Sequence, residues 1–515
     1  MSVGTLLTIP VPSHGQSLRP VHGATPEATL APEAILRQSD RMGANFSADD
    51  RSFQLFRLAE VGSELGTDSS RELVGKWARA LFRSAQQGPK DWNRGAFEKN
   101  AAVMLSSADP DEAFRLLKRV DAPDLSSDPP PPEDVRSFGA RTIFVDYWKR
   151  HGLKALNPIQ QAALGFGRTG EYPFPAMANV LAKLGTTDAE IEFRQRTLAD
   201  AVRCYLEPTR IQSSNQDFME FLEMRWSSLD RPSRLLALRA AVARLTSPPA
   251  DEPAKTFASR VTTNKGTASF DSEQMLLLYG IMGKVREVDA DWAEKLESDY
   301  PAMKQAGGAG AKAEQPSQVT VENRENNASQ DAVNSVVAKR LQSGTLARIR
   351  AVAGKDLDLA MRLLAQLTEP EFRSEGMAAI ATELWAKDPK SADSMLESAM
   401  LGASGIPADL QAKARASLSV AQAAAAMKQE ALFHAAIATG FTAATESVQE
   451  DVDIHPDKPY YLARGMNELS RLMELDMRIF PDDGSGRTAR MQDGELKAFL
   501  LIDCAEAEIH ANHRK

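Results

Sequence analysis

The chain has 515 residues, of which 43% are hydrophobic, 25% are charged and 6% are aromatic, and its formal net charge at pH 7 is −9. This balance is that of a soluble protein long enough for two or more domains, or for one elongated array of repeats. The negative net charge argues against a nucleic-acid partner, because phosphate binding requires a concentrated basic surface. No segment reaches the ~20 uninterrupted apolar residues of a transmembrane helix, so we expect no membrane span.

The N-terminal segment is rich in Pro, Gly and Thr, and residues 1–27 are expected to form a flexible tail. The stretch from Thr5 to Ser17 is apolar and then small and polar, like the end of a signal peptide, but it lacks a basic region before the apolar one. Two interpretations stay open. The protein is cytoplasmic with a flexible tail, or its true start lies upstream and it is exported to the periplasm.

Apolar residues at helical spacing dominate the chain from residue 26 onward. Capping residues and spacing predict helices over 49–65, 68–84, 91–106, 109–120, 133–150, 175–184, 188–206, 218–228, 233–245 and 271–296. Helices resume at Asp331 and continue to Ala507, with breaks expected at 450–459 and 481–486. No convincing strand is found, because residues 318–322 are too few and too polar. The expected fold class is therefore all-α.

A long internal repeat is the most informative pattern. Arg136-Ser-x-Gly-x-x-x-Ile-x-x-x-x-Trp148 recurs as Arg373-Ser-x-Gly-x-x-x-Ile-x-x-x-x-Trp385, at a constant offset of 237 residues (373 − 136). The ungapped match covers thirty positions, 136–165 against 373–402, and nine of them are identical. Unrelated sequences of average composition would share roughly two. The shared apolar positions follow i, i+3, i+4, i+7 and i+8 spacing, which is the buried stripe of a helix.

A second matching segment lies upstream of each copy. Residues 109–120 resemble residues 356–367, and the same pattern returns at Asp388, which is 32 residues after Asp356. In the first copy the equivalent spacing is ten residues longer, and the extra residues fall in the proline-rich loop 121–134, where an insertion costs little. The unit therefore has a period of about 32 residues, with two antiparallel helices joined by a turn. Asp followed by Pro is expected to cap the first helix of each pair.

Residues 306–330 form a polar, low-complexity stretch without an apolar stripe and are expected to be a disordered linker. This divides the chain into a tail (1–27), an N-terminal helical repeat domain (28–305), the linker, and a C-terminal helical repeat domain (331–515).

Several motifs resemble sites of known chemistry, but their context argues against each of them. Gly165-Phe-Gly167-Arg-Thr-Gly170 matches a dinucleotide fingerprint, yet a helix precedes it instead of the required strand, and Gly165 corresponds to Gly402 at the expected end of a helix. Asp451-x-Asp453-x-His455-x-Asp457 begins like a calcium loop but lacks its glycine and final glutamate.

The remaining metal-binding and thiol residues give no stronger signal. His510 and His513 share a helix face with Glu506 near the C-terminus, where a frayed tail is expected. Cys204 and Cys504 are expected to be free thiols, because neither has a neighbouring cysteine. No catalytic, metal or cofactor-binding residues are therefore assigned, and no cofactor is expected.

The repeat supplies the candidate site residues Arg136, Trp148, Arg373 and Trp385. The two arginines are expected either to line a concave ligand surface or to fix the packing of neighbouring helices through carbonyl groups or a carboxylate. The two tryptophans end the apolar stripe, and packing between repeats is the expected role of such large aromatic side chains.

The helix–turn–helix unit of about 32 residues, its small alanines and its proline at the helix start resemble the tetratricopeptide-like class of α-solenoids. The resemblance covers residues 91–165 and 331–402 and concerns architecture only, because the tryptophan lies late in the second helix and not early in the first. It implies a non-catalytic scaffold that binds a protein or peptide on a concave surface. The alternative is a helical-toroid enzyme, a hydrolase or lyase acting on carbohydrate, which would require paired carboxylates in an aromatic-lined cleft.

Overall fold

The computed structural model describes residues 31–90, 92–126, 133–207, 214–246, 257–263, 266–270, 272–301, 303, 318–323 and 342–513. The expected tail (1–27) and most of the expected linker (306–330) lie outside these residues. Contacts divide the chain into two compact units. Unit 1 comprises residues 1–45 and 331–515, and unit 2 comprises residues 46–330. Most described residues are helical, as predicted.

Unit 2 is built from helices that follow one another closely in sequence. They are α2 (Ala48–Glu64), α3 (Asp68–Ala85), α4 (Trp92–Leu105), α5 (Pro110–Leu117), α6 (Val135–His151), α7 (Leu156–Thr169), α8 (Phe174–Leu181), α9 (Asp188–Leu206), α10 (Ser214–Arg225), α11 (Arg231–Thr246), α12 (Glu273–Val288) and α13 (Ala290–Asp299). Two short 3-10 turns join them, η2 (Gly152–Ala155) after α6 and η3 (Trp226–Ser228) after α10.

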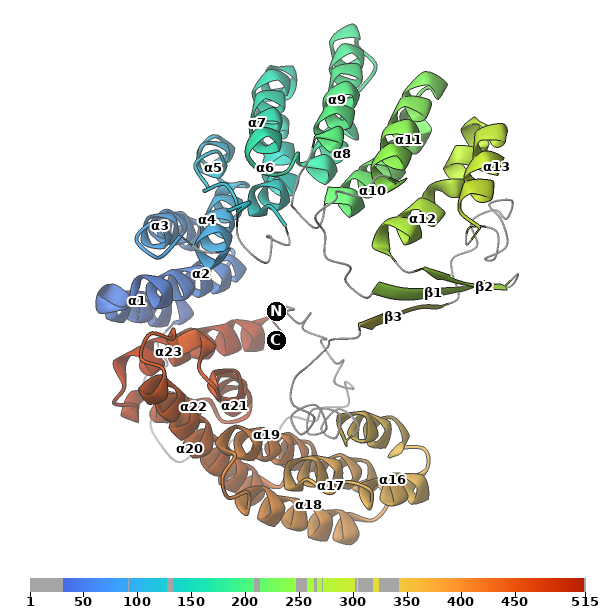
Figure 1. Ribbon diagram of the computed structural model, residues 1–515. Helices are drawn as coiled ribbons and strands as arrows, with labels where there is room; N and C mark the ends of the chain where they lie inside the picture. The colour runs from blue at the N-terminus through green and yellow to red at the C-terminus, as the bar shows by residue number, and fades with distance from the viewer. Residues whose placement is uncertain are drawn as a thin grey trace. The chain divides into compact units, whose positions relative to one another are not determined.

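The helices of unit 2 lie in two rows (Figure 1). The even-numbered helices form one row, in which each helix from α2 to α12 contacts the next even-numbered one. The odd-numbered helices form the other row, and only α7, α9 and α11 contact one another there to a comparable extent within the described residues. Because the even row is the more closely packed, it lies on the inner side of the curve that these helices follow (Figure 1).

Unit 1 contains a second set of paired helices. They are α1 (Pro32–Met42), residues 342–352, α16 (Leu357–Leu364), α17 (Pro370–Leu384), α18 (Pro389–Ser404), α19 (Leu410–Met427), α20 (Glu430–Ile454), α21 (Met466–Ile479), α22 (Pro481–Arg490) and α23 (Gly494–Asn512), with the turns η1 (Gly43–Asn45) and η4 (Tyr460–Leu462). Here α17, α19, α21 and α23 contact one another in sequence order, and α18 and α20 pack across them.

The first described helix belongs to unit 1. α1 packs along α23, and the Ser39 hydroxyl donates a buried hydrogen bond of 2.8 Å to the carbonyl oxygen of Ala498. Leu36 in α1 is fully buried. The predicted N-terminal domain (28–305) instead placed these residues with unit 2. Sequence order suggested that grouping, but burial of the apolar face of α1 against α23 decides it.

A small antiparallel sheet contradicts the expectation that the chain has no strands. β1 (Phe257–Thr263) lies between β2 (Gly266–Phe270) and β3 (Gln318–Asn323). β3 falls inside the expected disordered linker, so that part of the prediction was wrong. Its pairing with β1, for example Val261 opposite Val319, joins segments more than fifty residues apart. A local pattern cannot reveal such a partner, which is why these short polar strands were missed.

Three helix boundaries also differ from prediction. The expected helix 271–296 is two helices, because Asp289 ends α12 and its side chain caps α13 by accepting a hydrogen bond from Trp292 N (3.0 Å). The expected break at 481–486 is the start of α22, where Pro481 occupies the first turn. The expected loop at 450–459 begins later, since α20 continues to Ile454.

The internal repeat corresponds to the same local structure in both units. Residues 109–120 and 356–367 form α5 and α16, and the two Arg-Ser-x-Gly segments form α6 and α17. The same N-cap is found at Asp109, Asp356 and Asp388, and the helices that follow start at Pro110, Leu357 and Pro389. The φ angles of the three aspartates are −138°, −139° and −142°. The prediction that Gly165 and Gly402 end helices was wrong, because α7 and α18 continue to Thr169 and Ser404.

Within the described residues, no helix combines the length and the apolar character needed to cross a bilayer.

Candidate functional site

Arg136 is buried at the start of α6, with a relative exposure of 5%. Its guanidinium donates to both carboxylate oxygens of Asp134 (3.0 and 2.7 Å) and to the Thr169 hydroxyl (2.9 Å), and it lies 5.0 Å from the Phe166 ring centre. These contacts join the N-terminus of α6 to the C-terminal end of α7. Arg136 therefore connects the two helices while its charge is paired with a neighbouring carboxylate.

Arg373 occupies the matching position in α17 but lies in a different environment. Its side chain is exposed, and no carboxylate pairs with it among the described residues. The position equivalent to Asp134 is Glu371, which is buried and lies near Arg415 of α19 instead (4.0 Å). The repeat thus brings the same residue type to the same helix position without conserving its contacts.

Trp148 and Trp385 are both half-buried near the C-terminal ends of α6 and α17. The indole nitrogen of Trp148 is buried without a hydrogen-bond partner among the described residues. Trp385 is the residue that ends α17. Partial burial is consistent with packing at the edge of a helix pair, and neither ring lies in the fully buried core.

A cavity of about 250 Å³ opens in unit 2 at the ends of three even-row helices. Five of its lining residues carry carboxylates, and one, Arg141, is cationic. The complete lining is Glu133, Asp134, Phe138, Arg141, Glu171, Gln216, Asp217 and Glu220. We call this the acidic cavity. Its residues come from the start of α6, the loop before α8, and the first turns of α10.

The helix starts explain how so many carboxylates can lie together. α6, α8 and α10 all begin at this cavity, and the partial positive charge of a helix N-terminus stabilises nearby anions. Asp134 is the N-cap of α6, and it accepts hydrogen bonds from Arg136 N (2.9 Å) and Glu171 N (3.1 Å). In turn, the Ser137 hydroxyl donates to the Glu171 carbonyl oxygen (2.8 Å). Asp134 therefore has a structural role in the cavity wall.

Asp217 is the carboxylate of the cavity with the most altered acidity. Its side chain is 15% exposed, and burial raises its pKa to about 6, although Arg141 opposes this shift; Glu220 and Glu133 add to it by repulsion. Arg141 lies 3.2 Å from Asp217 and 3.6 Å from Glu220. A single guanidinium thus serves two carboxylates across the cavity.

Phe138 adds an aromatic surface to this cavity. It is 48% exposed, which is unusual for so large an apolar side chain. The Lys99 ammonium lies 4.9 Å from its ring centre and the Arg141 guanidinium 5.3 Å. The ring therefore already contacts cations in this structure, as the negative face of an aromatic ring favours.

The glycine motif and the Asp451 motif lie where they contribute to the fold. Gly165 and Gly167 lie inside α7, so the context of a dinucleotide site, a strand followed by a glycine-rich turn, is not met. Asp451 is buried; burial alone would raise its pKa, but hydrogen bonds from Lys458 Nζ (2.5 Å) and Arg464 N (2.9 Å) lower it. Asp451 therefore holds the turn after α20.

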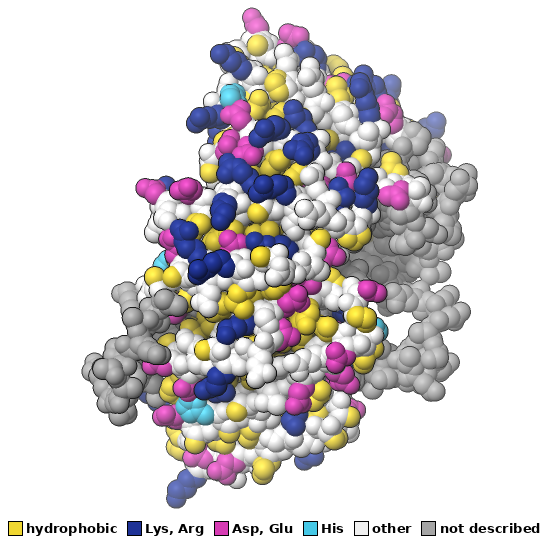
Figure 2. Space-filling view, turned by 90° about the vertical axis from the view of Figure 1, so that its left-hand side faces the viewer, with side chains coloured by type: hydrophobic (Ala, Val, Ile, Leu, Met, Phe, Trp, Pro, Cys, Tyr) yellow, Lys and Arg dark blue, Asp and Glu magenta, His cyan; other side chains and the backbone are white. Residues whose placement is uncertain are grey.

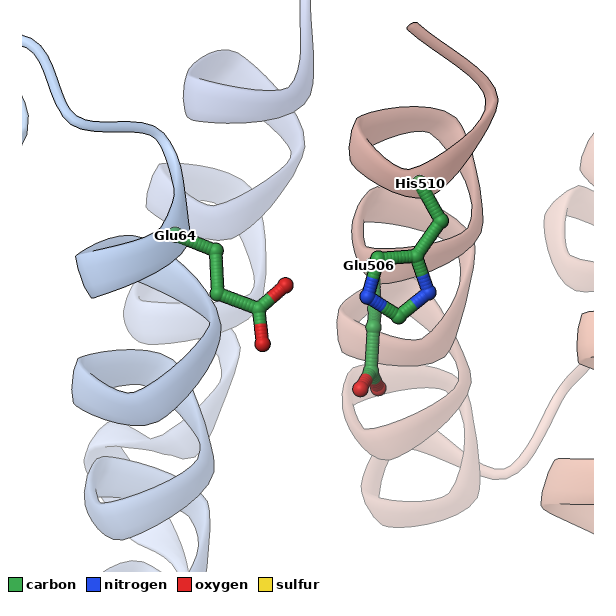
Figure 3. A group of neighbouring side chains, drawn as sticks. All are labelled: Glu64, Glu506 and His510. Carbon is green, nitrogen blue, oxygen red and sulfur yellow. The ribbon is translucent and has the colours of Figure 1, made fainter. Parts of the chain in front are cut away.

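Glu506 and His510 lie on successive turns of α23, as Figure 3 shows. His513 is the C-terminal cap of the helix, and its backbone N–H donates to the Ile509 carbonyl oxygen (3.1 Å). Glu64, which Figure 3 also labels, is the last residue of α2. Cys204 and Cys504 are free, and burial raises the pKa of their thiols to about 11 and about 12.

The sequence did not identify the acidic cavity. Its residues are spread over nearly ninety positions, and no two of the three contributing segments are adjacent in sequence. The one available signal was the concentration of Asp and Glu at predicted helix starts, which is also the ordinary capping preference.

A comparison with known protein families finds no model that matches this chain, and a comparison with curated proteins finds none that is similar to it.

Proposed function

We propose that this chain is a non-catalytic helical-repeat scaffold that binds a protein or peptide partner, and that unit 2 receives a cationic segment of that partner in the acidic cavity. Two rows of paired helices, with the same capped helix and the same glycine contact recurring in both units, support a solenoid of tetratricopeptide-like architecture. Solenoids of this kind commonly use the surface of one row for binding.

One observation carries the proposal. A hollow in the even row combines five carboxylates with one lining cation and a half-exposed phenylalanine. A lysine or arginine side chain fits both features, because its charge pairs with the carboxylates and its alkyl stem or guanidinium packs on an aromatic ring. Asp217 and Glu220 carry two negative charges and share one cation, Arg141, so they can pair with a second cation.

The test measures binding of a fluorescently labelled octa-arginine peptide to the full chain by anisotropy. Asp217→Asn combined with Glu220→Gln should weaken binding by about tenfold or more, since both carboxylates lose their charge. Asp217 has a pKa of about 6 and is charged only above it. Binding should therefore be tighter near pH 8 than near pH 5, and the double variant should lose most of this pH dependence.

The matched control is Asp358→Asn with Glu397→Gln, which removes the same charge from two exposed positions in unit 1. This control should bind nearly as well as the wild type. Equal weakening by both pairs would mean that the peptide responds to net charge alone, and the acidic cavity would then not be the binding site.

A second function is favoured by the raised pKa of Asp217. A carboxyl group that is partly protonated near neutral pH, beside charged carboxylates and an aromatic ring, is what a glycoside hydrolase requires of its general acid. This is the helical-toroid enzyme acting on carbohydrate. Incubation of the full chain with neutral and uronate-containing polysaccharides tests it. Release of reducing ends that Asp217→Asn abolishes would replace the scaffold proposal, and absence of release would leave binding as the function of the cavity.

A further inference from the structure

Lysine and arginine side chains gather on unit 2 along α3, α5 and the turn between α6 and α7. Figure 2 shows them over α3 and α5. We define the basic face by six exposed residues: Arg83 of α3, Arg115, Lys118 and Arg119 at the end of α5, and Arg150 and Lys154 at the end of α6 and in η2. This concentration of positive charge contrasts with the net charge of −9 of the whole chain.

Side-chain contacts join the helices that carry these residues. The Arg119 guanidinium lies 5.4 Å from the ring centre of Phe82 in α3, which connects the ends of α3 and α5. At the other end of α5, His151 of α6 lies 2.8 Å from Asp111, and Tyr147 stacks on Phe114 with ring centres 4.2 Å apart. α5 therefore forms the middle of the basic face, with α3 on one side and the α6–α7 turn on the other.

Three acidic residues of this region, Asp109, Asp111 and Glu112, already have side-chain partners, and that of Asp111 is His151 (2.8 Å). Glu112 pairs with Arg79 (2.7 Å) and with Arg115 (3.3 Å), and Asp109 also lies near Arg79 (3.7 Å). Among the described residues, no carboxylate pairs with the other five members of the face, which are Arg83, Lys118, Arg119, Arg150 and Lys154. Their charge is thus available to an external polyanion.

An exposed apolar side chain lies within this positive surface. Leu153 is 51% exposed and sits in η2, between Arg150 and Lys154 in sequence. The aromatic rings of the face, Phe82 and Phe114, are buried, at 2% and 4% exposure, beneath the cations of Arg119 and Lys118. The partly exposed ring of Tyr147 already stacks on Phe114, which limits its use as a platform for a nucleic-acid base. Leu153, in contrast, is an exposed apolar group that can enter a lipid layer.

We propose that the basic face binds the surface of a membrane that contains anionic phospholipids, with Leu153 reaching the boundary of the acyl chains. Clusters of four to eight basic residues are the usual size of such sites, and an apolar residue among them adds to the binding. This peripheral binding needs no membrane-spanning helix. It would hold the odd row of unit 2 against the membrane.

The test is co-sedimentation of the full chain with vesicles at low salt. Vesicles of phosphatidylglycerol mixed with phosphatidylcholine should bind it, and vesicles of phosphatidylcholine alone should not. The triple variant R83E/K118E/R119E should lower the apparent partition coefficient by at least about 100-fold, since each lost cation near an anionic surface contributes about fivefold and each added glutamate is repelled. No binding of the wild type to the mixed vesicles would overturn the proposal.

The matched control is R362E/K387E/K390E, which makes the same change of charge at three exposed residues of unit 1. It should lower the apparent partition coefficient by less than about tenfold. Equal loss in both variants would show a general charge effect and overturn the assignment to this face. If R83E/K118E/R119E does not fold, R150E/K154E serves as the second variant, and it should also lose binding.

Leu153→Asn separates a lipid from other polyanions, because it leaves the charge unchanged. It should weaken vesicle binding by about tenfold, as the loss of one inserted leucine implies. A short DNA duplex is tested in parallel. If the duplex binds more tightly than the vesicles and Leu153→Asn changes neither, the face is a phosphate-binding surface for nucleic acid, and the lipid proposal is wrong.

Discussion

Two glycines of the repeat, Gly139 and Gly376, explain at the residue level why the pattern recurs. A β-carbon on Gly139 would lie 3.1 Å from Leu117 Cδ1, and one on Gly376 would lie 2.8 Å from Leu364 Cδ1. Leu117 and Leu364 are themselves equivalent residues of the preceding helix in the two copies. Glycine therefore allows the second helix to approach the same leucine of the first, and the sequence match reflects a shared packing contact.

Replacing Gly376 by alanine tests this contact. Alanine favours a helix by about 0.5–1 kcal/mol over glycine, but overpacking against Leu364, Leu367 and Ile349 costs about 1–3 kcal/mol. We expect Gly376→Ala to lower the free energy of unfolding by about 1 kcal/mol in urea denaturation. Gly165→Ala is the control, because nothing lies within 4 Å of its β-carbon position, and it should be neutral or stabilising. Equal effects of the two changes would contradict the contact.

Arg136 and Arg373 show that the sequence repeat predicts the helix position of a side chain but not its contacts. Arg136 and Arg373 occupy equivalent helix positions, yet Arg136 is 5% exposed and paired with Asp134, whereas Arg373 is exposed. The repeat identifies the backbone position of each side chain. It does not identify the contacts, because the residue two positions before each arginine differs (Asp134 and Glu371) and the other neighbours of Arg136, Thr169 and Phe166, come from the next helix.

At the scale of helices, capping residues were the most reliable signal. Asp109 and Asp388 cap helices as predicted. The equivalent Asp356, which no proline follows, also caps a helix and accepts a hydrogen bond of 2.9 Å from Leu359 N. The errors in helix boundaries arose where one residue type can occupy either the interior, the start or the end of a helix. Asp289 was taken as a residue inside a helix but both ends α12 and starts α13, and Pro481 was taken as a break but begins α22.

Asp356→Ala measures what one such cap contributes. Loss of the side-chain hydrogen bond should lower the free energy of unfolding by about 1 kcal/mol. Asp356→Asn keeps an acceptor oxygen in the same place and should lose much less. Hydrogen exchange of α16 should rise in the alanine variant and remain near wild type in the asparagine variant. If the two variants unfolded alike, the charge or another contact of Asp356 would be responsible, and the capping explanation would fail.

At the scale of the whole molecule, most helix contacts within each unit follow sequence order, but three long-range features do not. The helical class and the paired helices could be predicted from local periodicity. The assignment of α1 to unit 1, the sheet that joins β1 to β3, and the acidic cavity all depend on residues far apart in the chain. Each arises from tertiary contacts that no repeat of about 32 residues encodes.

The position of α1 yields a prediction that separates the two groupings of the chain. Leu36 is fully buried in the helix that packs on α23, so Leu36→Ala should destabilise unit 1 by about 2–4 kcal/mol through loss of apolar contact and the resulting cavity. Hydrogen exchange followed by mass spectrometry should show faster exchange in α21 and α23 and no change in α3 to α5. Faster exchange in α3 to α5 with α23 unchanged would place α1 with unit 2, as sequence order had suggested, because a cavity weakens first the elements that surround it.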